Sequence, residues 1–345
     1  MLRDVLKQNQ FIEYVYICAR NLISCERRQM LIDSYRNDKL TMMGEKNPDK
    51  VILMIDASNS YTSGFFSNLS SILLKCAYAH DRGMTPVIYR KTPSHYNEPE
   101  RYLGTDNYFE YFFRQPAGIK ISDAMESKHV VWQAGKHVRE YYHMERHRQD
   151  RVYVEEIRRC LKFKDVIRDE LEDSRKVFLG DRKVLGVKYR GTGYKYRHKG
   201  HPVYVSIDEV MEHTEAIYDK GYDYIYLATE DKSALDAFKK RFGNELVYDG
   251  NILRADEGQL HIDLATSDPK HHTAYLEGLN VLKDVWVLSH AASFVGAQCG
   301  VTKFVYLFNE AFSQKQFENL DIIDKGVYKR GVNSIKEGIK KYGIQ

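Results

Sequence analysis

Cysteine pairs are missing from this sequence, and their absence limits its chemistry. Of the 345 residues only five are cysteine, at positions 18, 25, 76, 160 and 299, and no two of them form a CxxC pair. An odd number of unpaired cysteines is typical of thiols that are kept reduced. We therefore expect a cytoplasmic protein with free thiols and without a zinc site, because zinc sites usually draw on paired ligands.

The sequence also lacks the short patterns that mark several common sites. It contains no GxGxxG, no GxxxxGK[ST], no HExxH and no GxSxG. These absences argue against the usual dinucleotide site, a P-loop, a zinc protease and a serine hydrolase. No apolar run reaches membrane length, and the first 25 residues lack the apolar core of a signal peptide.

Neither positive nor negative residues are in large excess, with 52 Lys or Arg against 48 Asp or Glu. The formal net charge is +4, with 29% charged and 43% hydrophobic residues, which is the composition of an ordinary folded chain long enough for two medium domains. Such a mild balance does not favour general nucleic-acid binding. The aromatic and basic stretch 134–153 leaves single-stranded nucleic-acid binding as a minor alternative, which a steep dependence of affinity on salt would favour.

One stretch does carry a local excess of positive charge. From Arg182 to His201 there are seven Lys or Arg residues, two His and no acid. Arg190 stands where an apolar strand turns into the loop RGTGY, and its guanidinium fork matches phosphate oxygens. Gly191 lets backbone N–H groups approach a ligand, and Thr192 adds a hydroxyl. The pattern favours a diphosphate site, with a basic surface loop as the alternative.

Short apolar strands alternate with amphipathic helices along most of the chain, which predicts parallel sheets flanked by helices. The first series is a strand at 50–56, a helix at 69–83 and a strand at 84–90. In the second series we expect strands at 183–190, 222–231, 245–249 and 293–298, and helices at 206–221, 232–243, 272–291 and 301–309. Residues 95–118 look like an irregular connection, and residues 121–173 look mainly helical.

These series predict an α/β protein with two Rossmann-like domains whose parallel sheets face a central cleft. The boundaries we expect are an N-terminal helical segment at 1–48, an N-terminal α/β domain at 49–172, a C-terminal Rossmann-like domain at 173–320 and a C-terminal helical tail at 321–345. The first segment either packs on its own domain or contacts a membrane surface through a basic amphipathic helix.

Polar residues follow other predicted strands. Thr229, Glu230 and Asp231 end one strand, where they can bind a ligand or cap the next helix. Asp284 lies on an otherwise apolar helix, where it has a structural role or binds a ligand.

Two loops that open helices are also expected to contact a ligand through small or polar residues. They are the loop with Gly296, Gln298 and Cys299, and in the first domain the loop with Ser63, Gly64, Phe65 and Asn68.

The order of these stretches resembles the fucosyltransferase superfamily. The residues that carry the resemblance are LGVKYRGTGY with GHP, then YIYLATED, then LNVLKDVWVLSHAASFVGAQ, with GFFSNLSSILLKCAYAHDRGMTPVIY in the first domain. The match covers roughly residues 50–310. It implies a GT-B architecture and an inverting, metal-independent transfer of fucose or a related sugar from a GDP-sugar to a glycan acceptor.

The resemblance also implies roles for particular residues. Arg190 falls on the essential arginine of the family motif and would hold the donor's β-phosphate. Asp284 and residues 296–302 would lie near guanosine and ribose. Lys188, Gly191 and Gly193 replace the motif's His, second Arg and Asp, which leaves acceptor handling open.

The general base is open as well, with His198, His201, Glu230 and Asp231 as candidates. The alternative function is a catalytically degenerate protein that binds a nucleotide sugar or glycan. For an active enzyme, polysaccharide biosynthesis at the inner face of a membrane is the setting we expect.

Overall fold

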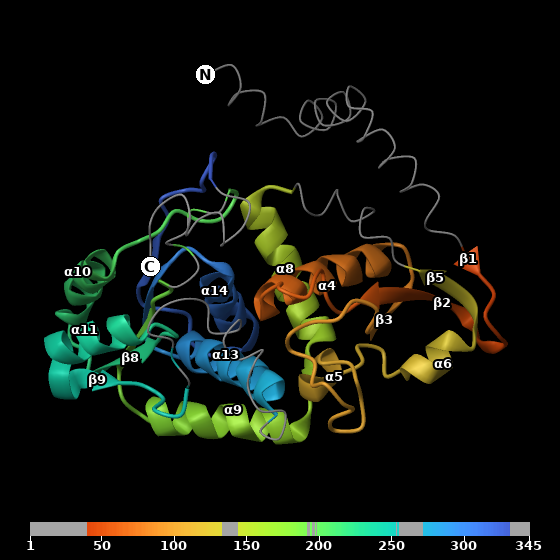
Figure 1. Ribbon diagram of the computed structural model, residues 1–345, viewed down its shortest axis with the longest axis horizontal. Coiled ribbons are helices and arrows are strands. Elements are labelled where there is room, and N and C mark those ends of the chain that lie inside the picture. The colour runs from red at the N-terminus through yellow and green to blue at the C-terminus, as the bar shows by residue number, and fades with distance from the viewer. Residues whose placement is uncertain are drawn as a thin grey trace, which may run out of the picture.

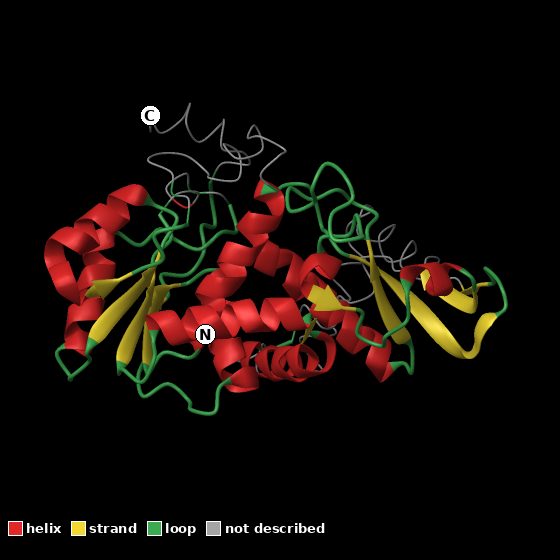
Figure 2. Cartoon of the chain, turned by 90° about the horizontal axis from the view of Figure 1, so that it is seen from below, coloured by secondary structure: helices red, strands yellow, loops and turns green. Residues whose placement is uncertain are grey.

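The molecule is elongated, with one β-sheet near each end and a layer of helices between them (Figures 1 and 2). The computed structural model describes residues 40–132, 144–191, 194, 197, 199–252, 254 and 272–331. Within these residues, no helix has the length and apolar character needed to cross a membrane.

The N-terminal sheet has the strand order β1-β5-β2-β3. Its strands are β1 (Leu40–Thr41), β2 (Lys46–Asp56), β3 (Thr85–Tyr89) and β5 (Ser127–Trp132). Strand β2 is parallel to both β3 and β5, and only the edge strand β1 is antiparallel. The helices α4 (Phe65–Asp81) and α6 (Ile121–Met125) pack against it. The apolar residues 52–55 of the inner strand β2 are fully buried, which is typical of a parallel strand covered on both faces.

The C-terminal sheet has five parallel strands in the order β11-β10-β7-β8-β9. They are β7 (Val184–Lys188), β8 (Tyr224–Ala228), β9 (Leu246–Val247), β10 (Ser293–Ala297) and β11 (Leu320–Ile323). In chain order this is the 3-2-1-4-5 arrangement of a doubly wound fold. Its strand order reverses between β7 and β10, and ligands bind at such a reversal, beyond the carboxyl ends of the strands.

Helices connect and cover this second sheet. They are α10 (Ile207–Tyr218), α11 (Lys232–Phe242), the short 3₁₀ helix η2 (Gly243–Glu245), α13 (Thr273–Ser289) and α14 (Gly300–Phe312). Between the two sheets run α5 (Phe109–Phe112), α8 (Arg146–Cys160) and α9 (Asp165–Phe178), with a small sheet of β4 (Phe113–Arg114) and β6 (Lys162–Phe163).

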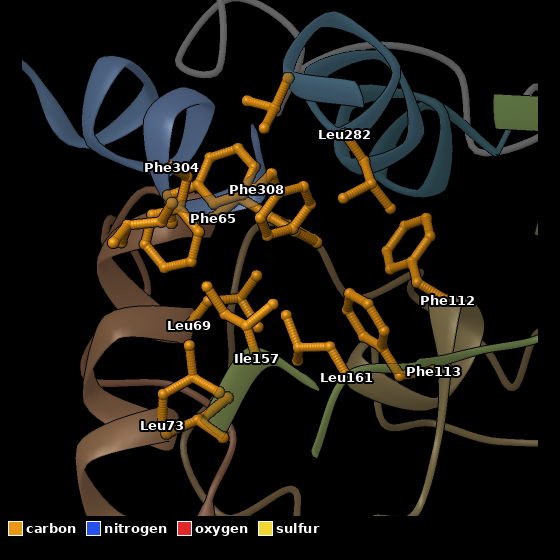
Figure 3. Close-up of a cluster of buried hydrophobic side chains, with 14 of the residues drawn as sticks. Phe65, Leu69, Leu73, Phe112, Phe113, Ile157, Leu161, Leu282, Phe304 and Phe308 are labelled. Carbon is orange, nitrogen blue, oxygen red and sulfur yellow. The ribbon is translucent and has the colours of Figure 1, made fainter. Parts of the chain in front are cut away.

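The two sheets share one hydrophobic core. Side chains from α4, α5, α8, α13 and α14 meet in a continuous apolar cluster (Figure 3). The rings of Phe66 on α4 and Phe304 on α14 have centroids 4.6 Å apart, and Phe65 packs edge-to-face on Phe112 at 5.4 Å. The N-terminal and C-terminal units are therefore fused through aromatic contacts rather than joined by a linker.

The predicted elements of both series are confirmed, and so are their end signals. Ser206 caps α10 by accepting a hydrogen bond from the Glu209 backbone N–H. Gly83 and Gly221, expected to end helices, adopt the positive φ angles of +66° and +95° that glycine tolerates.

The described part of 121–173 is mainly helical, as expected, but residues 127–132 within it form β5, because SKHVVW is too short to show a period of its own. Two other expectations about secondary structure are wrong. Residues 320–323 form β11 and extend the C-terminal sheet, where a helical tail was expected from 321. Strands β1 and β2 begin at 40 and 46, inside the segment 1–48 that was expected to be helical. The rest of 1–48, residues 1–39, lies outside the described residues.

Gly278 on α13 gives a test of the shared core. A Cβ atom there would lie 2.7 Å from Cζ of Phe112, a fully buried ring that stacks on Tyr275. We expect Gly278→Val to lower the free energy of unfolding by about 1–3 kcal/mol, because the ring has little room to move. Urea denaturation measures this. The matched control is Gly250→Val, where a Cβ would meet nothing within 4 Å; equal losses in both variants would contradict the packing described.

Candidate active site at the junction of the two units

Arg190 lies just beyond the carboxyl end of β7, beside the reversal in strand order. Its Nε atom is 3.5 Å from Oε1 of Glu230, and its guanidinium carbon lies 5.4 Å from the ring centroid of Tyr194. The side chain is 27% exposed, yet Nε is buried and has no hydrogen-bond partner among the residues that the structure describes. A buried guanidinium with an unused donor is a site for an anion.

Strand register explains why Arg190 and Glu230 meet. Lys188 at the end of β7 pairs with Ala228 at the end of β8. Two residues further along each strand come Arg190 and Glu230. The chain then turns closely, because a Cβ on Gly191 would lie 2.5 Å from Oδ2 of Asp231. Gly191 is thus required for the loop to pass the end of the neighbouring strand.

The N-terminal unit supplies a second wall, and α13 supplies a carboxylate. His95 and Tyr96 follow β3, and Nε2 of His95 lies 3.6 Å from Oε1 of Glu277 on α13. Nδ1 of His95 donates to the Tyr61 carbonyl at 2.7 Å, and the Tyr96 hydroxyl accepts from the Phe65 backbone N–H at 3.0 Å. Both aromatic side chains are therefore held in place by the loop that leads into α4.

The charged residues at this junction shift one another's pKa values. Burial, and then repulsion from Glu230, raise the pKa of Glu277 to about 8, against the attraction of Arg190. Glu230 in turn raises the pKa of Arg190, and burial lowers the pKa of His95. Near neutral pH, Glu277 therefore holds a proton while Glu230 is paired with Arg190. A carboxyl group poised in this range can take up or release a proton during a reaction.

Lys188 and Asp284 were expected to contact a donor, and the structure places them in a buried ion pair. Nζ of Lys188 lies 3.6 Å from Oδ2 of Asp284, with the side chains only 3% and 7% exposed. The Tyr226 hydroxyl donates to Asp284 at 3.3 Å. Burial raises the pKa of Asp284, and Lys188 opposes that rise. This pair ties β7 to α13 beneath the strand ends.

Two polar residues after β8 organise the start of α11. Asp231 caps this helix by accepting from the Ala234 backbone N–H at 3.2 Å, so the capping interpretation is confirmed. The Thr229 hydroxyl accepts from the Asp231 backbone N–H at 3.1 Å. Both residues are 1% exposed. Of the three polar residues after β8, Glu230 is the one paired with Arg190.

The loop after β10 lies on the other side of the strand-order reversal. The sulfur of Cys299 caps α14 by accepting from the Thr302 backbone N–H at 3.3 Å. Gln298 accepts from Arg146 on α8 at 3.0 Å. Gly296 lies within β10, where a Cβ would meet the Phe294 ring at 2.8 Å. The amino end of α14 is therefore formed next to the end of β7.

The first-domain loop is held by its own side chains. Ser63 and Ser60 share a hydroxyl contact at 2.7 Å, and the buried Asn68 accepts from the Asn59 backbone N–H at 3.0 Å. Gly64 is the exposed N-cap residue of α4, while Phe65 belongs to the shared core. Of the four residues predicted here to contact a ligand, Gly64 and the partly buried Ser63 are accessible from solvent.

His201 is not among the residues described above as contacting Arg190. It is exposed, its ring lies 5.9 Å from the ring of Tyr194, and its carbonyl accepts from the Tyr328 backbone N–H at 2.9 Å. Thr192, Gly193 and His198 lie outside the described residues, as do residues 134–143 of the aromatic and basic stretch.

The basic stretch has counter-charges that its own sequence does not show. Lys183 pairs with Glu318 at 2.8 Å, Lys188 with Asp284 and Arg190 with Glu230. Arg182 donates to three carbonyls at the end of α9, a favourable place for a cation. Of the four cations at 182–190, Arg190 is the one that lies at the junction.

Sequence reasoning missed His95, Tyr96, Tyr194 and Glu277. The first two lie in the connection at 95–118, where nothing in the residues showed which would face the second unit. Glu277 did leave a signal, because it is an acid next to the buried residues Gly278 and Leu279. An acid at the edge of a buried helix face needs a partner or a raised pKa, and Glu277 has both.

Comparisons with known proteins give structural likenesses only. No family model matches the chain, and no curated protein matches it. The described structure is similar to the solved structure of NodZ α-1,6-fucosyltransferase soaked with GDP-fucose, with 14% identity, a TM-score of 0.45, and coverage of 75% of this chain and 92% of that one.

It is also similar to POFUT1 in complex with GDP, with 10% identity, a TM-score of 0.44, and coverage of 81% and 99% of the two chains. A third similar structure is a variant of Arabidopsis thaliana FUT1 with GDP, with 9% identity, a TM-score of 0.42, and coverage of 81% and 72%. The strand order and pairing confirm the expected α/β class with largely parallel sheets.

The raised pKa of Glu277 predicts a pH-dependent stability. An unfolded glutamate ionises near pH 4.5, whereas Glu277 in the fold keeps its proton up to about pH 8. The folded state therefore binds more protons in this window, and stability falls as pH rises through it, by about 1.4 kcal/mol for each unit of pKa elevation.

We expect Glu277→Gln, which cannot ionise, to gain stability over the unaltered protein between pH 5 and pH 8. Urea denaturation at several pH values measures the difference. Glu212→Gln, an exposed position on α10, is the control and should show no such trend. A pH-independent difference for Glu277→Gln would contradict the raised pKa.

Proposed function

We propose that this chain is an inverting glycosyltransferase that moves fucose or a related sugar from a GDP-sugar to a glycan acceptor, without a metal ion in the transfer step. The observation that carries the proposal is Arg190 at the strand-order reversal, where its buried Nε lies 3.5 Å from the Glu230 carboxylate and makes no hydrogen bond to the described residues. The sequence resemblance, which puts the phosphate-binding arginine at this position, supports the same assignment.

Arg190 is the group proposed to hold the diphosphate. In the absence of donor, Glu230 partly neutralises it from one side at 3.5 Å. A diphosphate brings at least two negative charges and can use the free Nε donor, so it competes well with a single carboxylate. The amino end of α14 adds the positive end of a helix dipole next to the same strand ends.

Glu277 is proposed as the general base. Its raised pKa and its place between His95 and the charges of Arg190 and Glu230 suit a group that accepts a proton near neutral pH. The acceptor hydroxyl would lose its proton to Glu277 as its oxygen bonds to the anomeric carbon. The bond from that carbon to the diphosphate breaks, and its electron pair goes to the phosphate oxygen held by Arg190. One base and one leaving-group stabiliser are sufficient for a single displacement with inversion.

The acceptor is proposed to approach from the N-terminal unit. His95 and Tyr96 are buried on that side of the junction, and the 52% exposed Tyr61, whose ring lies 6.2 Å from that of His95, offers an aromatic surface suited to a sugar ring. A surface glycan or its lipid-linked precursor fits the expected setting, which is polysaccharide biosynthesis in the cytoplasm, with the chain at the inner face of a membrane.

Arg190→Lys tests the phosphate role. Lysine keeps the charge but loses the guanidinium fork, so we expect GDP affinity to fall at least about tenfold and sugar transfer about 100-fold or more. Calorimetry with GDP and a donor-consumption assay measure the two effects.

Arg182→Lys, in the same basic stretch but at the end of α9, is the control and should bind GDP normally. If Arg190→Lys bound GDP and consumed donor as the unaltered protein does, the proposal would be wrong.

The pH dependence of the rate tests the base. A base must be ionised, so kcat/KM should rise with pH and level off above about pH 8, where Glu277 has lost its proton. Glu277→Gln should lose this rise and most of its rate while still binding GDP. Removing the Glu230 charge with Glu230→Gln should shift the midpoint to lower pH. An unchanged pH profile in Glu277→Gln would assign the base elsewhere.

A further inference from the structure

Four potential metal ligands meet between α4 and α8, on elements separate from the Arg190 site. Cys76 and His80 are four residues apart on α4, and Glu156 and Cys160 are four residues apart on α8. This spacing places each pair on one face of its helix. The two helices pack against each other, so the two faces meet.

The ligand atoms are close enough to share one ion. The two sulfurs and a carboxylate oxygen of Cys76, Cys160 and Glu156 lie within 4.8 Å of one another. The Cys160 thiol donates to Oε2 of Glu156 at 3.2 Å, and Nδ1 of His80 lies 2.9 Å from that same oxygen. Ligand atoms around a tetrahedral zinc ion are about 3.4–3.8 Å apart, given its usual bond lengths, so small shifts of these side chains suffice.

Burial makes the cluster costly without a cation. Both cysteines are fully buried and Glu156 is 5% exposed, while His80 lies at the rim with its side chain 18% exposed. The Arg159 guanidinium reaches Glu156 at 3.8 Å from a 61% exposed position, so it offsets the carboxylate only from the solvent side. Two thiols and a carboxylate in one buried space need a positive partner if they are ionised together.

We propose that Cys76, His80, Glu156 and Cys160 bind a zinc ion that fastens α4 to α8. Thiolate, imidazole and carboxylate are the ligands that zinc uses, and four of them complete a closed structural site. Two thiolates and one carboxylate carry three negative charges, which zinc reduces to one, and Arg159 lies beside that remainder. Binding releases the two thiol protons to solvent, so affinity rises with pH.

The position of the site indicates a structural role for the ion. Helix α8 also packs on α14, and both α4 and α8 contribute side chains to the shared core (Figure 3). An ion between α4 and α8 would therefore hold one wall of the core in which the two units meet. This proposal differs from the expectation that the chain has no zinc site, which looked for CxxC pairs: here the pairs are Cys-x₃-His and Glu-x₃-Cys.

The test is metal content and cobalt spectroscopy on the full chain. The protein, purified with reductant and reconstituted with Zn²⁺, should retain about one zinc per chain after dialysis. Co²⁺ in its place should give the sulfur-to-cobalt charge-transfer band and the intense visible bands of a tetrahedral site. Cys160→Ser should lose the charge-transfer intensity, while Cys299→Ser, which removes a buried thiol elsewhere, should keep it.

Measurements on the unaltered protein keep the test valid if Cys160→Ser fails to fold. A strong chelator should lower Tm, Zn²⁺ should restore it, and Mg²⁺ should not, because a ligand of the native state alone stabilises that state. Titrating thiols should release zinc in step with their modification.

Absence of zinc after reconstitution would overturn the proposal, as would a Cys76–Cys160 disulfide that persists in reductant. Arg190→Lys should retain its zinc, so a failure of the proposed transferase activity is distinguishable from a failure of this site.

Discussion

The parallel pairing of β7 with β8 and β10 is the constraint on which the candidate site depends. Since Lys188 pairs with Ala228 and with Gly296, the residues just beyond these positions emerge together at one edge of the sheet. Arg190 and Glu230 are brought into contact by this register and not by any pattern within either segment. The same pairing brings the start of α14 to this edge, so that an arginine and a helix amino end, both of which attract negative charge, lie there together.

The second wall depends on hydrophobic packing instead. Phe65 and Phe66 anchor the start of α4 in the shared core, and the Tyr96 hydroxyl is hydrogen-bonded to the backbone of Phe65. The apolar side chains thus decide where His95 and Tyr96 stand relative to Glu277. Packing and electrostatics meet at this point, since the burial that the core imposes is also the main cause of the raised pKa of Glu277.

Much of the fold was predictable from the sequence, because alternating apolar strands and capped helices leave local signals such as Ser206 and Gly221. Arg190 was predictable for the same reason, as an arginine between a buried strand and a glycine. Glu277 and His95 were not, because their role arises from contacts between segments far apart in the chain. The basic stretch shows the converse: its counter-charges Glu318, Asp284 and Glu230 are distant in sequence, so the stretch looked unpaired.

The contact between the rings of Phe66 and Phe304 bears on which motions the molecule allows. Rotating the two halves apart would bring these rings and their neighbours into water, at a cost of roughly 25 cal/mol for each Å² of apolar surface. A hinge motion that separates the two units is therefore energetically unfavourable in this molecule. Motions that leave these aromatic contacts closed avoid that cost.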